Sequence, residues 1–71
     1  MITVEQAAAR VDEVRAHAAA GDDERAHAAE DSLMVEALEA IASGRLSAVE
    51  AAEMARMAYR TGSVEFSRWC G

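Results

Sequence analysis

Two histidines stand among acidic residues in the first half of the chain, and this combination of side chains can bind a transition metal. Imidazole nitrogens and carboxylate oxygens are ligands for zinc, manganese and iron. The residues with this chemistry are Glu13, His17, His27, Glu30 and Asp31. Their separations of three or four residues place each histidine on one helix face with its acidic neighbours. Metal binding by facing helices is therefore one hypothesis for this chain.

The same spacing also has an interpretation without metal. His27 with Asp31, and Glu13 with His17, are i,i+4 pairs that contribute roughly 0.2–0.5 kcal/mol each on exposed helix faces. Di-iron bundles use Glu-x-x-His on paired helices. This chain instead has Glu13 four residues before His17, and Glu30 three residues after His27. The departure favours the ion-pair interpretation, and no cofactor is predicted.

Catalytic chemistry has little support in the residue pattern. Cys70 is the one cysteine, which leaves no intrachain disulfide and favours a reducing compartment. A cysteine nucleophile needs a neighbouring base, and no such partner can be assigned to Cys70. The four glycines are spaced as helix terminators and do not form a phosphate-binding loop. We therefore predict that the protein is not an enzyme and has no catalytic residues.

The three aromatic residues all lie within the last thirteen positions of the chain. Aromatic side chains bury large apolar areas, so this segment is expected either to complete the core or to anchor a partner. The residues assigned as core or partner anchors are Tyr59, Phe66, Arg68 and Trp69 in this segment, together with Met54 and Met57 just before it. The preceding helices contain few large apolar side chains, which favours the core. Phe66 and Trp69 are then predicted to cover the bundle, with Arg68 in water.

Composition limits the kinds of partner. A chain of 71 residues removes only about 60% of its unfolded surface from water, so a second protomer or a partner protein is expected to add stability. We predict a homo-oligomer, most simply a dimer. A net charge of −6 opposes nucleic-acid binding. The sequence has no basic leader and no apolar stretch of the ~18 residues needed to span a bilayer. These features predict a soluble cytoplasmic protein without membrane contact.

Cap residues and the absence of proline predict an all-α fold. Thr3 with Gln6 and Ser47 with Glu50 form capping boxes. Asp22 or Asp23 can cap a further helix. The glycines expected at left-handed helix ends are Gly21, Gly44 and Gly62. Together these residues predict a single helical domain over 1–71, a bundle of three helices. The expected elements are helices at about 4–20, 23–42 and 48–60, and a short C-terminal helical turn at 63–69.

The apolar spacing of each helix predicts which side faces inward. The first helix carries a narrow stripe of Val4, Ala7 or Ala8, Val11, Val14 and Ala18. The stripe of the second is Ala26, Glu30, Leu33, Ala37, Leu38 and Ile41. The third has Ala48, Ala51, Ala52, Ala55 and Ala58 on one side, beside Met54 and Met57. Such small residues allow a neighbouring helix to approach closely. The short first loop predicts an antiparallel hairpin that brings His17 near His27.

Three motifs carry a resemblance over residues 22–71. They are A-H-x-x-E-D-x-L from Ala26, L-x-x-I-A-x-G from Leu38, and V-E-F-S-R-W-C from Val64. In these motifs the chain resembles a group of small proteins of unknown function from actinobacteria and their phages. The resemblance supplies no catalytic residue, and it implies a phage product that binds and redirects a host protein. We therefore expect a non-enzymatic protein-interaction module, with a metal-binding hairpin and a structural oligomer as alternatives.

Overall fold

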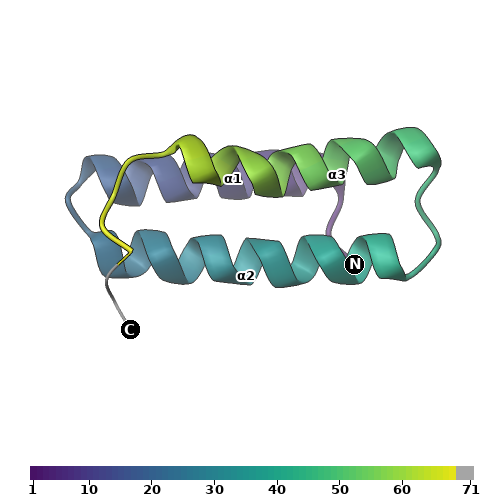
Figure 1. The fold of residues 1–71 in the computed structure, drawn as a ribbon, viewed down its shortest axis with the longest axis horizontal. Coiled ribbons are helices and arrows are strands. Elements are labelled where there is room, and N and C mark those ends of the chain that lie inside the picture. Colours follow the sequence, from purple (N-terminus) through teal and green to yellow (C-terminus); the bar gives the residue numbers. More distant parts are fainter. Residues whose placement is uncertain (69–71) are drawn as a thin grey trace.

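A computed structural model describes residues 1–68 of the chain. Its elements are α1 (Val4–Ala19), α2 (Asp23–Ala42), α3 (Ala48–Arg60) and the 3-10 turn η1 (Thr61–Ser63). Figure 1 shows α2 lying antiparallel to α1 and α3, and each helix contacts the other two. The predicted all-α three-helix bundle is confirmed. No helix within residues 1–68 combines the length and the apolar character needed to cross a membrane.

Side-chain caps fix the beginnings of the helices. The Thr3 hydroxyl accepts a hydrogen bond from the Gln6 backbone N–H at 3.1 Å, and the Thr3 N–H donates to Gln6 Oε1 at 2.9 Å. Ser47 and Glu50 form the same reciprocal pair, at 3.1 and 2.9 Å. Asp22 caps α2 by accepting from the third backbone N–H of that helix. Both reciprocal hydrogen-bond pairs are present, so both predicted capping boxes are confirmed.

The ends of the helices follow the glycine pattern in two cases and depart from it in the third. Gly21 and Gly44 have φ values of 76° and 71°, as predicted for residues that end a helix in the left-handed conformation. Gly62 has no positive φ and lies inside η1. The prediction that Gly62 occupies a left-handed helix end is therefore wrong.

The chain leaves α3 through a tightened turn. The buried Thr61 hydroxyl donates to the Ala58 carbonyl at 2.9 Å, which satisfies one of the acceptors left free at a helix end. The helical turn predicted at 63–69 is consequently displaced to Thr61–Ser63. Residues 65–68 follow without regular secondary structure.

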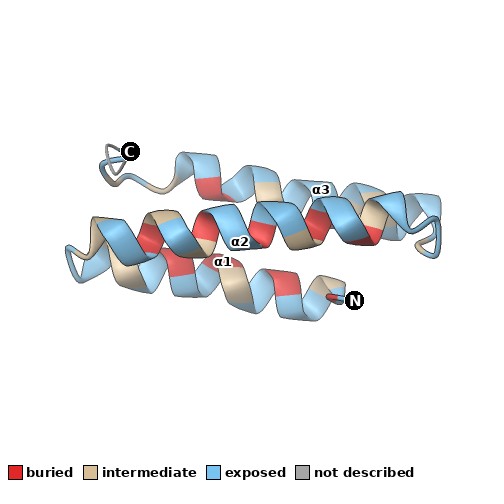
Figure 2. Cartoon of the chain, turned by 90° about the horizontal axis from the view of Figure 1, so that it is seen from below, coloured by how far each residue is buried: buried red, intermediate tan, exposed pale blue. Residues whose placement is uncertain are grey.

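The core is small and rich in alanine and valine. Its buried apolar residues are Ile2, Ala7, Val11, Val14, Ala26, Leu33, Ala37, Ala40 and Met54. In Figure 2 buried positions recur along α1 and α2, whereas α3 is mostly exposed. Leu33 and Met54 are the largest fully enclosed apolar side chains. They fill the space between the helices that the alanines leave open.

Two expectations about helix faces are wrong. Leu38 is 66% exposed, and Ala40 takes the inward position on α2 instead. Because each helical residue turns by about 100° from the last, a core centred on Leu33 and Ala37 leaves Leu38 at the edge. On α3 the core side is occupied by Met54. The exposed alanines of the predicted inward stripe are Ala48, Ala52 and Ala55.

Candidate functional site

An ion pair between α2 and the C-terminal segment engages the buried carboxylate of Glu30. Glu30 is 5% exposed. Arg68 donates from Nε to Glu30 Oε1 and from Nη2 to Glu30 Oε2, each at 3.0 Å. Two parallel bonds between guanidinium and carboxylate give a charge-assisted pair with defined geometry. Glu30 therefore holds the C-terminal segment against α2.

Arg68 also contacts the segment of the chain that precedes it. Its Nη2 donates to the carbonyls of Thr61 at 2.9 Å and Val64 at 3.1 Å. Its guanidinium carbon lies 3.9 Å from the centre of the half-buried Phe66 ring, a cation–π contact. We call residues 64–68 the C-terminal strap. Figure 1 shows the strap crossing from the end of α3 to the beginning of α2.

The ion pair changes the acidity of both partners. Hydrogen bonds from Arg68 lower the pKa of Glu30, although burial of the carboxylate acts in the opposite direction. The carboxylate in turn raises the pKa of Arg68. Both groups are therefore charged at neutral pH, and both are committed to a structural contact.

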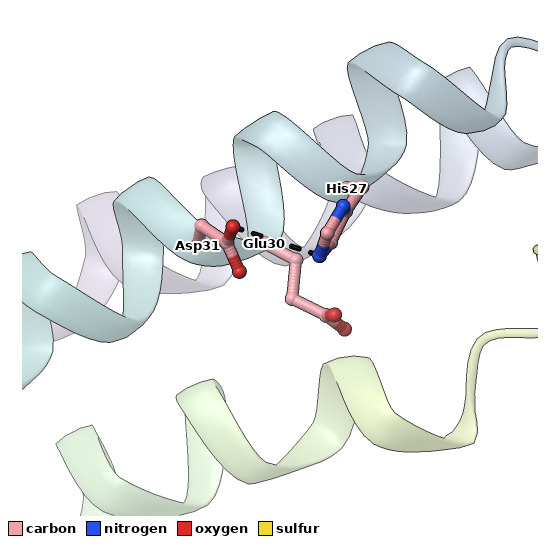
Figure 3. A group of neighbouring side chains, drawn as sticks. All are labelled: His27, Glu30 and Asp31. Atoms are coloured by element: carbon pink, nitrogen blue, oxygen red, sulfur yellow. Dashed lines mark ion pairs between the residues drawn. The ribbon is translucent and has the colours of Figure 1, made fainter. Parts of the chain in front are cut away.

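Part of the predicted metal set does come together. Figure 3 shows Glu30 pointing from α2 toward α3, with His27 and Asp31 beside it on the same helix. One ligand atom from each of these three residues lies within 4.8 Å of the others. His27 Nε2 is 3.6 Å from a carboxylate oxygen of Asp31, the i,i+4 pair expected without metal. Because Arg68 already engages both oxygens of Glu30, a cation there would have to displace the strap.

The other half of the predicted metal set lies elsewhere. Glu13 is paired with Arg10 at 3.8 Å. Arg10 also reaches across to α2, where it donates to Glu36 and, at 2.8 Å, to Ser32. His17 is half-buried on α1 and is not a member of the group around Glu30. The antiparallel hairpin therefore forms as predicted without joining the two histidines in one ligand set.

The residues predicted as core or partner anchors separate into distinct environments. Met54 is fully buried, and Met57 packs partly buried against the core. Tyr59 is 86% exposed. Phe66 is half-buried in the strap. Trp69 lies outside the described residues, as does Cys70.

The expectation that Arg68 stays in contact with water is confirmed, because Arg68 is exposed, but its ion pair was not predicted. Its side chain is 37% exposed and is paired with a carboxylate 38 residues away in the chain. The inward stripe of α2 already contained Glu30, an acid whose neighbour on the same helix face is His27 and which has no arginine within four positions along the chain. That was the one feature of the sequence pointing to a distant arginine, but it could not say which of the seven arginines would supply the charge.

An apolar groove runs between α2 and α3. It is lined by Met34, Ala37, Leu38, Ile41, Ala55, Ala58 and Tyr59. We call this surface the α2–α3 face. None of its lining residues is charged, although 28% of the chain is. Large exposed apolar side chains on one surface are typical of binding sites. Leu38 was predicted to lie in the core, so its place on this surface was not foreseen from the spacing.

Comparisons with protein-family models, curated proteins and solved structures find no match to this chain. The class of this protein is therefore defined by its fold alone. The chain is a three-helix bundle with a C-terminal strap held by an ion pair to the buried Glu30. The resemblance to small actinobacterial and phage proteins stays a prediction.

Proposed function

We propose that this protein is a small non-enzymatic interaction module that binds another protein through the α2–α3 face. The observation that carries the proposal is the uncharged lining of this groove in a chain with a net charge of −6. Two of its lining residues, Leu38 and Tyr59, have 66% and 86% of their surfaces exposed. Apolar and aromatic side chains of this kind supply most of the energy at protein interfaces.

The resemblance to phage proteins makes a protein of an actinobacterial host the expected target, reached in the host cytoplasm. The negative net charge supports a protein partner over nucleic acid, because phosphate backbones require a basic surface. The strap does not serve as the binding arm in this proposal. Its Arg68 is already engaged by Glu30.

Affinity capture from an actinobacterial lysate tests the proposal. The wild-type protein is expected to retain a specific host protein, and Leu38→Glu is expected to lose it because the new charge must be buried on binding. Val49→Glu is the matched control, since Val49 is also 66% exposed but is not among the residues that line the groove. Equal capture by wild type and Leu38→Glu would contradict the proposal.

A further inference from the structure

The hydrogen-bond acceptors around Arg68 match the shape of a guanidinium group. The Nε and Nη2 atoms of Arg68 each donate to one carboxylate oxygen of Glu30, and Nη1 donates to the Phe66 carbonyl at 3.4 Å. Nη2 also donates to the carbonyls of Thr61 and Val64. Every nitrogen of the guanidinium is therefore engaged. A planar fork of donors satisfies this set of acceptors, whereas the compact ammonium of a lysine does not have that shape.

The charged acceptor of this arrangement belongs to the helical bundle. Glu30 lies on α2 with 5% of its surface exposed, and Thr61 is fully buried in η1. A carboxylate enclosed to this extent needs a cation to offset its lost hydration. The Arg68 side chain that supplies the cation is itself 37% exposed. The acceptors around Arg68 therefore combine a buried charge with a side that is open to water.

The apolar core does not depend on the strap. The core cluster that contains Leu33 and Met54 includes no residue of the strap. Within residues 1–68, the hydrogen bonds and ion pairs that join the strap to α2 are all made by Arg68. Withdrawal of this one side chain therefore leaves the packing of the core cluster in place and leaves the carboxylate of Glu30 without its cation.

From this geometry we propose that the acceptors around Arg68 form a guanidinium-binding site, which accepts an arginine side chain of another polypeptide when Arg68 is withdrawn. The site consists of the Glu30 carboxylate and the carbonyls of Thr61, Val64 and Phe66. None of these residues lines the α2–α3 face. The inference therefore goes beyond the proposed function and does not rest on it.

The full-length Arg68→Ala variant tests the proposal, because it empties the site. The probe is arginine blocked at both ends, acetylarginine amide, which carries the guanidinium on a peptide-like backbone. It is expected to raise the Tm of Arg68→Ala saturably, by about 5–10 °C when its concentration is about tenfold above its dissociation constant. The wild-type protein is expected to show no such rise, because Arg68 already fills the site.

A matched probe and two matched variants separate the site from general effects of charge. Acetyllysine amide has the same charge without the planar fork, so it should raise the Tm of Arg68→Ala less. Glu30→Gln/Arg68→Ala should respond to neither probe, because the buried charge is gone. Arg45→Ala should also not respond, since Arg45 is exposed and forms no ion pair within residues 1–68.

Three results would overturn the guanidinium-binding site. They are the absence of a saturable response in Arg68→Ala, an equal response to the two probes, and an equal response in Glu30→Gln/Arg68→Ala. If circular dichroism shows that Arg68→Ala has lost its helicity, acetylarginine amide is expected to restore it and acetyllysine amide is not. Helicity that neither probe restores would count against the site in the same way.

Discussion

The carboxylate of Glu30 and the guanidinium of Arg68 form a two-bond ion pair that joins residues 38 positions apart. The pair is asymmetric, because Glu30 is almost fully enclosed and Arg68 keeps part of its surface in water. A buried carboxylate without a partner is costly. The strap is therefore tied to the bundle by the need to neutralise Glu30.

Removal of the arginine is expected to destabilise the fold. Arg68→Ala should lower the free energy of unfolding by about 1–3 kcal/mol, since Glu30 loses its hydrogen-bonded partner. Replacement of both residues by apolar ones, Glu30→Leu with Arg68→Met, should recover most of this loss because no charge then needs compensation. Urea unfolding followed by circular dichroism gives the values.

Arg45→Ala is the control for this series. Arg45 is exposed, and its side chain forms no ion pair within residues 1–68. Its removal should change stability by less than about 0.5 kcal/mol. A double variant as unstable as Arg68→Ala would show that the ion pair is not the source of the effect.

Acid should weaken the same contact. The pKa of Glu30 is lowered in the folded protein by the hydrogen bonds from Arg68. Its contribution is therefore complete above the unfolded value of about 4.3 and is lost as pH falls through the folded value. The stability difference between wild type and Glu30→Gln should shrink as pH is lowered from neutral to about 3.

Glu50 must be separated from this effect. Hydrogen bonds from Ser47 also lower the pKa of Glu50, so acid weakens that capping box in every variant. The comparison of wild type with Glu30→Gln removes this shared change. A difference that stays constant over the whole pH range would disprove the role assigned to Glu30.

Two leucines on α2 should respond oppositely to truncation. Leu33 is fully buried and Leu38 is 66% exposed. Leu33→Ala should cost about 2–5 kcal/mol through lost burial and a residual cavity, while Leu38→Ala should cost less than about 0.5 kcal/mol in the monomer. Thermal or urea unfolding at low protein concentration measures both. Similar losses would place Leu38 in the core, as its sequence spacing first indicated.

Metal addition should have no effect on the intact protein. Both oxygens of Glu30 are engaged by Arg68, which leaves His27 and Asp31 as the accessible members of the group. Protein purified without chelator is expected to carry no stoichiometric metal, and zinc, manganese or iron should leave its Tm unchanged. One equivalent of bound metal together with a raised Tm would revive the metal-binding alternative.

Local sequence was sufficient to predict the three helices of this fold. Thr3, Ser47 and Gly21 act on backbone groups within a few residues, so their roles as caps and terminator follow from chemistry that does not depend on the rest of the chain. The buried position of Leu33 also follows from helical spacing. The inward stripe of α2 even included Glu30, without indicating what would neutralise it.

The contacts that define the candidate surfaces depend on how the helices are arranged in space. Spacing along α2 could not distinguish Leu38 at the edge from Ala40 inside, because the boundary is set by where α1 and α3 pack. Spacing also could not pair Glu30 with Arg68, which meet only when the strap returns to the beginning of α2. Helix formation is encoded by neighbours in the chain, whereas burial and ion pairing are encoded by neighbours in space.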